Sequence, residues 1–396
     1  MAARSLPPAL AAGFRATAAL QAQVTAWATI NSGSDHHAGL ARQADELDRA
    51  CRRLTPDVHR IPIAEDGRVI IHARRRPAAA VRVLCSGHYD TVYGAAHPFQ
   101  TCTQPDAVTL RGPGVADMKG GLVVLLAALE AFEQLPEANQ LGWEILLTPD
   151  EETGSSGSRP HLEAAAARVH VGLVFEPARP GGELVHTRKG IGQVTLTARG
   201  RAAHAGQDPG AGRNAIAALA ELIVQLPRAA DALPALQVNV GRIHGGGPLN
   251  MVPDLAVAEL DLRAADLGSA DRWRTRLEAL VAEVTRRTDV TVDITGGFSR
   301  PPMEATPEGD RLFALLQEVR DGLALPPVAR VRAGGGSDAN FLQAAGLPCL
   351  DGLGPVGGSL HSSDEYIELP SLAERALVAA GLLRRLAQAG PAAWRA

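Results

Sequence analysis

The chain has 396 residues, of which 46% are hydrophobic and 21% charged, a composition typical of a soluble globular protein. This length is enough for two domains, because single hydrophobic cores stop growing well before it. The net charge of −4 provides no basic field for nucleic acid or an anionic membrane, so neither is expected as a partner.

The first half of the chain alternates short apolar runs with helical patterns. Its N-terminal stretch "LPPALAAGF" is too short and too broken by proline for a signal peptide, and no apolar run reaches transmembrane length. The predicted elements are helices over 10–30, 40–54 and 120–135, and buried strands over 81–86, 144–148 and 172–176. Strands separated by helices indicate an α/β layer around a mostly parallel sheet.

From about residue 190 the apolar and polar residues alternate strictly. In "QVTLTAR", Val194, Leu196 and Ala198 share one face, which is typical of an antiparallel sheet with one solvated side. Ser269 is the expected N-cap of the second helix in this part. The predicted elements are strand 193–199, helix 213–226, strands 236–243 and 255–263, helix 270–287 and strand 290–295. Their β-α-β-β-α-β order predicts a ferredoxin-like arrangement.

The change of pattern divides the chain into two predicted domains. A small ferredoxin-like α+β domain at 191–297 is inserted into a larger α/β domain formed by 1–190 and 298–396. After residue 300 the helical patterns and buried runs return, as expected for the second part of the larger domain.

Chemically reactive side chains follow the predicted strand ends. "TPDEETGSSGS" places Asp150, Glu151 and Glu152 side by side directly after a buried strand, where like charges repel unless a cation lies among them. Four further stretches, "SGHYDTVYG", "GPGVADMKGG", "VFEP" and "LHSSDEY", supply His88, Asp90, Asp117, Glu176 and His361. Ligands of open α/β sheets bind outside the carboxyl ends of the strands, so these segments are expected to converge there.

Two histidines and several carboxylates, without cysteine, form a ligand set that suits zinc, with cobalt or manganese as possible substitutes. Two ions about 3.5–4 Å apart can polarise a carbonyl and activate a water, which requires roughly five ligands and one free carboxylate. The sequence offers Glu151 as the free carboxylate and, as ligands, His88, Asp117, Glu152, Glu176 and His361. Adjacent residues on extended backbone point in opposite directions, so Glu151 and Glu152 can serve different roles.

Each stretch by itself has a simpler explanation. A histidine beside a strand is usually a hydrogen-bonded surface or core residue, and "DMKGG" can be an ordinary helix start. "DEETG" alone is more often a solvated loop. The functional interpretation depends on the combination, because all five stretches fall at strand ends in one chain order.

The combination resembles the M20 family of metallopeptidases, the di-zinc hydrolases that include glutamate carboxypeptidase, acetylornithine deacetylase, succinyl-diaminopimelate desuccinylase and aminoacylase. The matching stretches also include "GRAAHAGQDPGAGRNAI", "LNMVPD" and "AGGGSDANF", and they cover nearly the whole chain from about residue 25 in the family's order. The resemblance implies a zinc-peptidase catalytic domain of the phosphorylase/hydrolase-like α/β type, with an inserted lid and dimerisation domain.

The resemblance also implies roles for the individual residues. Asp117 would bridge two zinc ions, with Glu152 and His361 completing one site and His88 and Glu176 the other. Asp90 would fix the tautomer of His88, and Glu151 would be the general base. A metal-bridging hydroxide would attack the amide, and Asp150 has no assigned role. A cis peptide bond after Asp117 is a further expectation of the family.

In the inserted domain, the resemblance implies residues that bind substrate. His204 would reach the active site, often that of the partner subunit, and hold the carbonyl oxygen of the bond to be cleaved. Asn250 and Arg263 would bind the substrate carboxylate, since the arginine fork pairs bidentately with a carboxylate. The glycine-rich segment 333–339 would offer backbone N–H groups, and Lys189 has a weaker match. A homodimer formed through this domain is expected.

The resemblance implies a zinc-dependent amide hydrolase for a small carboxylate-bearing substrate, closest to the glutamate carboxypeptidases, which release a C-terminal amino acid. The alternative is an N-acyl amino acid deacylase of the acetylornithine deacetylase or aminoacylase type. A scaffold protein with a dead site is disfavoured because no ligand or base is lost, and a two-metal phosphoesterase because Arg263 and Asn250 favour a carboxylate.

The cysteines of the sequence bear on the compartment of the protein. They lie far apart without a CxxC pair, at Cys51, Cys85, Cys102 and Cys349. This spacing predicts neither a disulfide framework nor a thiolate zinc site. We therefore expect reduced thiols and a cytoplasmic location.

Overall fold

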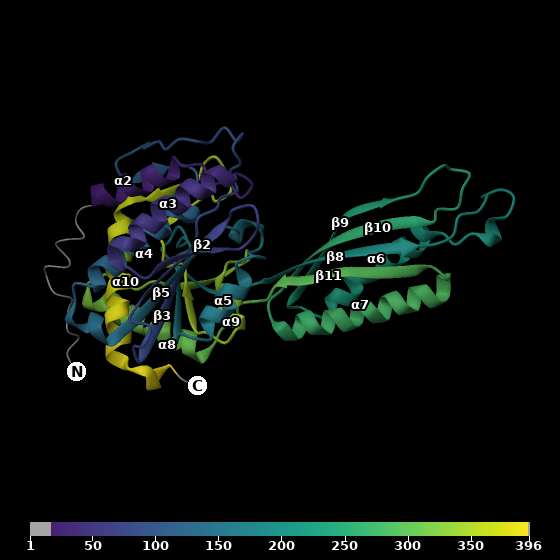
Figure 1. Ribbon diagram of the computed structural model, residues 1–396. Helices are drawn as coiled ribbons and strands as arrows, with labels where there is room; N and C mark the ends of the chain where they lie inside the picture. The colour runs from purple at the N-terminus through teal and green to yellow at the C-terminus, as the bar shows by residue number, and fades with distance from the viewer. Residues whose placement is uncertain (1–16, 395–396) are drawn as a thin grey trace. The chain divides into compact units, whose positions relative to one another are not determined.

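The computed structural model describes residues 17–394 and divides the chain into two compact units (Figure 1). The first unit comprises Met1–His186, Ala305–Arg332 and Ser337–Ala396, and the second comprises Thr187–Glu304 and Ala333–Gly336. The predicted insertion at 191–297 lies within the second unit. The N-terminal stretch and the first part of the helix expected over 10–30 lie outside the described residues.

The first unit is built on an eight-stranded sheet with the order β1-β2-β5-β3-β6-β13-β7-β12. Its four central strands are parallel, with Val81 of β3 opposite Leu141 of β5 and Gly172 of β6 opposite Cys349 of β13. The bounds are β1 Val58–Pro62, β2 Val69–Arg75, β3 Val81–His88, β5 Leu141–Thr148, β6 Val171–Val174, β7 Leu184–Arg188, β12 Arg330–Ala333 and β13 Cys349–Asp351.

The α/β fold with a mostly parallel central sheet is therefore confirmed, with antiparallel pairs on either side of the four central strands. β1, β2 and β5 pair antiparallel on one side, and β13 pairs antiparallel with β7 on the other. The run "VRVLCS" forms the first six residues of β3, where Val83, Leu84 and Cys85 are fully buried. A parallel strand covered on both faces requires such a continuous apolar run.

Helices cover both faces of this sheet (Figure 1). Val83 and Cys85 of β3 face the main hydrophobic core, which also contains α2, α3, α4, α8 and α10. Leu84 faces the other way, toward the side where α5 and α9 pack together. The bounds are α2 Thr17–Ala28, α3 His37–Leu54, α4 Gly120–Phe132, α5 Arg159–Ala166, α8 Pro307–Gly322, α9 Ala339–Ala344 and α10 Leu369–Ala389.

A small three-stranded sheet, β14-β15-β4, lies beside the N-terminal end of α4 in the first unit. Its strands are Gly357–Gly358, Tyr366–Glu368 and Thr109–Arg111, and Tyr366 of β15 pairs with Arg111 of β4. The pairing brings the segment after residue 357 next to the segment before residue 115, although the two lie far apart in the sequence.

The second unit has the predicted ferredoxin-like order, β8-α6-β9-β10-α7-β11, around an antiparallel sheet with the strand order β11-β8-β10-β9 (Figure 1). Val194, Leu196 and Ala198 are buried, as the alternation in the sequence predicts. The bounds are β8 Gly190–Arg199, α6 Ala215–Asp231, β9 Leu236–Gly245, β10 Leu255–Ala264, α7 Leu267–Thr288 and β11 Thr291–Arg300.

The predicted N-cap of α7 is wrong. The helix begins three residues earlier than a Ser269 cap implies, and Asp266 is its N-cap, with a carboxylate that accepts a hydrogen bond from Ser269 N at 2.6 Å. An aspartate on extended backbone satisfies this free N–H as well as a serine does, so residue type alone did not identify the cap.

In residues 17–394, every helix is either too short or too polar to cross a bilayer.

Replacing the N-cap Asp266 by alanine should lower the free energy of unfolding by about 1 kcal/mol, because the N–H of Ser269 loses its acceptor. Urea denaturation measures the change. Asp271→Ala is the control, since this aspartate on the same helix is 73% exposed and pairs only with Arg274 nearby. Equal effects of the two substitutions would show that the cap contributes nothing specific.

Candidate metal centre

The loops that follow the central parallel strands bring together the predicted side chains of the first unit. His88 is the last residue of β3 and Asp90 follows it, while Glu152 follows β5 and Glu176 follows β6. Parallel strands end at the same edge of the sheet, so these side chains lie at one carboxyl edge. Asp117 comes from the turn before α4, and His361 from the loop between β14 and β15.

Asp117 contacts both predicted histidines. His88 Nε2 lies 3.0 Å from Asp117 Oδ1 and 3.7 Å from Glu176 Oε1. His361 Nε2 lies 3.3 Å from Asp117 Oδ2 and 3.3 Å from Glu152 Oε2. The side chains thus form two groups, His88 with Glu176 and His361 with Glu152, which share the two oxygens of Asp117.

This arrangement fits a metal site by its donor atoms and by its burial. Ligand atoms of His88, Asp117 and Glu152 all lie within 4.8 Å of one another. Among the described residues, Glu152 Oε1 is a buried oxygen without a hydrogen-bond partner. A buried carboxylate oxygen without a donor is costly, and a cation held by imidazole and carboxylate ligands would satisfy it.

The charges of the site favour bound cations. Burial opposes protonation of His88, but contacts with Asp117, Asp90 and Glu176 outweigh it and raise the pKa of His88 well above its usual value. Asp117 and Glu152 raise the pKa of His361 to about 10. Burial and the nearby Asp117 raise the pKa of Glu152. The carboxylates therefore favour positive charge at this site, either on the histidines or on a bound cation.

Asp90 connects His88 to the loop that carries the two glutamates. Its backbone carbonyl lies 3.0 Å and its carboxylate 3.3 Å from His88 Nδ1. The two carboxylate oxygens accept the backbone N–H groups of Glu151 and Glu152, each at 3.1 Å. Ser34 Oγ donates to the same carboxylate at 2.9 Å. One fully buried aspartate therefore orients the imidazole and fixes the start of the glutamate loop.

The turn that presents Asp117 leaves the regular helical path. Gly114 has a φ of 69°, and Asp117 and Met118 have non-helical backbone angles just before α4 begins. The peptide bond between Asp117 and Met118 is cis, as the resemblance implied. Backbone N–H groups in this turn lack helical acceptors and are bound instead by the buried carboxylate of Glu365, which the sequence analysis did not single out.

The expectation of extended backbone at Glu151 and Glu152 is wrong. Glu151–Thr153 form a single 3₁₀ turn, because Asp150 accepts backbone hydrogen bonds from Thr153 and Ser155 through its carbonyl. Successive side chains of a 3₁₀ helix are about 120° apart, so Glu151 and Glu152 still point in different directions. Glu151 and Glu152 can therefore still serve different roles, but because of the 3₁₀ turn and not because of extended backbone.

Asp150 is a structural residue of this loop. It is 1% exposed, and its carboxylate accepts hydrogen bonds from Gly157 N at 2.9 Å and from the backbone and side chain of Ser158. Of the three adjacent acids, therefore, one closes the loop, whereas Glu152 faces Asp117 and His361.

The predicted substrate-binding residues belong to the second unit. His204 is exposed, and its Nδ1 accepts the N–H groups of Gly206 and Gln207, both at 3.1 Å. Asn250 is exposed, and its backbone carbonyl accepts a hydrogen bond from Ala205 N. Arg263 makes a bidentate ion pair with Asp261, at 3.0 and 3.1 Å, so its fork is already occupied.

Two weaker candidates, Lys189 and the glycine-rich segment 333–339, make contacts within the protein. Lys189 Nζ donates to Gln237 Oε1 at 2.8 Å. In the glycine-rich segment 333–339, the carbonyls of Gly335 and Gly336 accept hydrogen bonds from Arg188, while Asp338 accepts from Thr148 and Ser155. The segment therefore supports the loop after β5 through the side chain of Asp338, a role that its glycines did not indicate.

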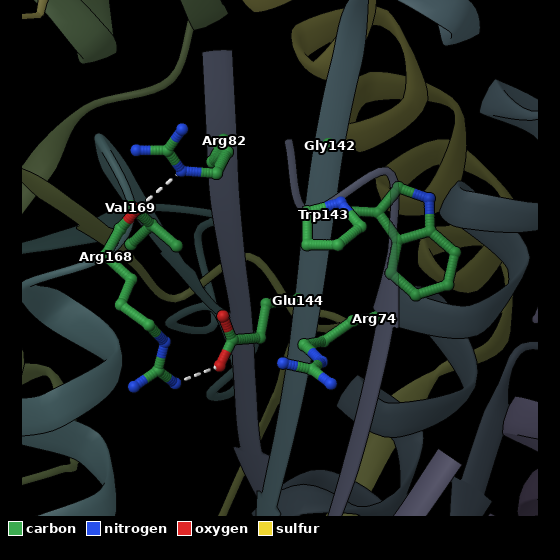
Figure 2. A pocket seen from close by; sticks show the side chains of 8 residues that line it. Arg74, Arg82, Gly142, Trp143, Glu144, Arg168 and Val169 are labelled. Atoms are coloured by element: carbon green, nitrogen blue, oxygen red, sulfur yellow. Dashed lines mark hydrogen bonds and ion pairs between the residues drawn. The ribbon is translucent and has the colours of Figure 1, made fainter. Parts of the chain in front are cut away.

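A pocket at the opposite ends of the strands contains none of the predicted site residues (Figure 2). Arg82 lies near the start of β3, about 20 Å along the strand from His88, and Glu144 lies in the middle of β5, about 13 Å from Thr148. Arg168 pairs with Glu144, and Arg74 pairs with Asp57, so these charges are balanced within the protein. We assign the chemistry to the carboxyl edge.

Replacing Asp150 by alanine should lower the free energy of unfolding by about 1–3 kcal/mol, because buried donors at Gly157 and Ser158 lose their acceptor. The adjacent substitution Glu151→Gln should change it by less than about 0.5 kcal/mol. Urea denaturation of the two variants compares them. An unchanged stability of Asp150→Ala would contradict the structural role.

Comparison with known proteins places this geometry in a family. Residues 84–385 match the model of peptidase family M20/M25/M40. The chain is 28% identical over 367 residues to carboxypeptidase G2 of Pseudomonas sp. (strain RS-16), covering 90% of this chain and 86% of the relative. It is 30% identical over 351 residues to succinyl-diaminopimelate desuccinylase of Acidovorax ebreus (strain TPSY), covering 83% and 87%.

A solved structure gives the same result for the fold. Aminopeptidase PepT of Bacillus cereus superposes with a TM-score of 0.77 and 20% sequence identity, covering 94% of this chain and 99% of the other. The family match spans well over half of the chain and includes all the residues that surround Asp117 at the carboxyl edge. The chain therefore belongs to peptidase family M20/M25/M40, and it is a metallohydrolase of that family.

Proposed function

We propose that the protein is a two-zinc hydrolase that cleaves an amide bond of a small carboxylate-bearing substrate and releases a C-terminal amino acid. The observation that supports it most directly is the position of Asp117, whose two oxygens lie 3.0 and 3.3 Å from two different histidines. A carboxylate shared in this way is suited to bridge two ions, and carboxypeptidase G2 is among the relatives.

The proposed metal ligands form two sets around Asp117. His88 and Glu176 would hold one ion, and His361 and Glu152 the other. When bound, the ions would supply Lewis acidity and lower the pKa of a water molecule. Zinc suits this mixture of imidazole and carboxylate donors, and cobalt or manganese would be substitutes.

Glu151 is the proposed general base. Its backbone is held by Asp90, its side chain is half-buried, and its neighbour Glu152 contacts His361. A carboxylate at this place would accept the proton of the attacking water and later give it to the leaving amine. Asp90 would support the reaction by orienting both His88 and the loop that carries the base.

The second unit would supply the substrate contacts and act as a lid and dimerisation domain. Because two N–H groups donate to Nδ1 of His204, its Nε2 is the nitrogen that carries the proton and can donate to a carbonyl oxygen. Arg263 and Asn250 would bind the substrate carboxylate. A substrate carboxylate at the fork of Arg263 would take the place of Asp261, which has the same chemistry.

A second candidate function is an N-acyl amino acid deacylase. It is favoured by the similarity to a succinyl-diaminopimelate desuccinylase, which is a relative of comparable coverage. The two activities use the same reaction and differ in which side of the amide is recognised. Either enzyme would act in the cytoplasm, which is supported by cysteines that remain free thiols at Cys51, Cys85, Cys102 and Cys349.

The zinc-loaded protein should hydrolyse peptides or acyl compounds with a C-terminal glutamate, and Glu151→Gln should lower kcat by about 10²–10⁴-fold with KM and zinc content unchanged. Release of the free amino acid measures turnover. Glu163→Gln is the matched control, because the side chain of Glu163 is 42% exposed and its ion-pair partner is Arg159. Turnover of simple N-acetyl amino acids alone would favour the deacylase, and an active Glu151→Gln would contradict the base.

Addition of zinc should raise the Tm of the metal-free protein, because the ions relieve the repulsion among the buried carboxylates. At about 100 times the Kd, the gain per site is about 2.7 kcal/mol. Thermal unfolding with and without zinc measures it, chelation should reverse it, and magnesium is the control because it binds imidazole poorly. A Tm that does not respond to zinc would contradict the metal sites.

A further inference from the structure

Glu365 lies beside the turn that carries Asp117, and its carboxylate contacts the backbone of this proposed ligand rather than its side chain. It follows His361 by four residues, directly before β15, and it is only 1% exposed. Its position connects it to the His361 loop by sequence. The pairing of β15 with β4 brings it beside the turn before α4, where Asp117 is located.

The carboxylate of Glu365 binds the backbone of the Asp117 turn at three points. Its Oε1 accepts the N–H groups of Ala116 at 2.8 Å and of Asp117 at 3.0 Å. Its Oε2 accepts the N–H of Gly114 at 3.2 Å. The carbonyl of Glu365 also accepts from Gly112 N, so the contacts extend over the whole turn.

A third segment completes the arrangement. The hydroxyl of Tyr93, in the loop after β3, lies 2.7 Å from Glu365 Oε2 and 2.8 Å from the carbonyl of Ser362, so it can donate to either. The loops that carry His88, Asp117 and His361 therefore meet at one buried carboxylate. Tyr93 joins the first loop to it by a hydrogen bond, and the Asp117 turn donates backbone N–H groups to it. The His361 loop leads directly into Glu365 along the chain.

The backbone of the Asp117 turn requires such an acceptor. The turn contains the left-handed Gly114 and the non-helical Asp117, and N–H groups at the start of a helix have no helical carbonyl to receive them. Glu365 receives the N–H of the same residue whose side-chain oxygens lie between His88 and His361. A shift of this backbone would move both oxygens relative to both histidines.

We infer that Glu365 is a positioning residue that sets the distance between the Asp117 turn and the His361 loop, and thereby the geometry of a two-ion site. The inference depends on the proposed function and adds to it the residue that keeps the two ligand sets in register. Glu365 acts through the backbone of Asp117, so its removal should alter metal binding even though it is not a ligand.

The test is a titration of the metal-free full-length protein with Zn²⁺ alone, in competition with a chromophoric chelator. Glu365→Ala should weaken binding by about 10–100-fold, the usual effect of removing a residue that orients metal ligands. Glu365→Gln should lose less, because its amide oxygen can still accept from Ala116 and Asp117 while its NH₂ group faces the N–H of Gly114. The visible spectrum of the Co²⁺ form should change in both variants.

The matched control is Asp364→Asn, which removes the adjacent acid of the same loop. Asp364 is 73% exposed and pairs with Arg111 at the surface, so zinc affinity and the Co²⁺ spectrum should stay within twofold of wild type. Thermal unfolding of each metal-free variant checks that it is folded. If Glu365→Ala does not fold, the affinity and spectrum of Glu365→Gln decide the question.

Wild-type zinc affinity and an unchanged Co²⁺ spectrum in a folded Glu365 variant would overturn the inference and leave the proposed function standing. A wild-type protein that binds no zinc would overturn the proposed function and this inference with it. An equal loss of affinity in Asp364→Asn would also overturn it, because the effect would then belong to the loop and not to Glu365.

Discussion

The carboxyl edge of the large sheet depends on the attraction between Asp117 and the two histidines beside it. His88 and Asp117 are almost completely buried, and the side chain of Glu152 is only 7% exposed. Buried carboxylates at such short distances repel one another, and water cannot screen them. The charge balance of the site therefore favours a bound cation, and one histidine lies on either side of Asp117.

The same edge uses further buried acids as hydrogen-bond acceptors. Asp90, Asp150 and Glu365 each accept two or more backbone N–H groups from a loop that carries a proposed ligand or the proposed base. Asp338 holds the loop after β5 by accepting hydrogen bonds from the hydroxyls of Thr148 and Ser155. The acids of the site thus have two roles: Asp117 and Glu152 face the histidines, and the others hold the loops that carry the site.

Much of this arrangement could be predicted from the sequence because it depends on local patterns. The apolar run of β3, the alternation in β8 and the acids at the strand ends can each be recognised from a few neighbouring residues. The short strands β7, β12 and β13 could not be found in this way, because long-range pairing and not propensity defines them. The roles of Asp266 and Glu365 could not be predicted for a related reason, since they depend on which N–H groups the fold leaves free.

The most direct test of the account is anomalous X-ray scattering at the zinc edge from crystals of the zinc-loaded protein. The account predicts two peaks on either side of Asp117, one near His88 and Glu176 and the other near His361 and Glu152. A single peak at Asp117 would contradict the two-ion site. Peaks elsewhere, with none at Asp117, would contradict the assignment of the chemistry to this edge of the sheet.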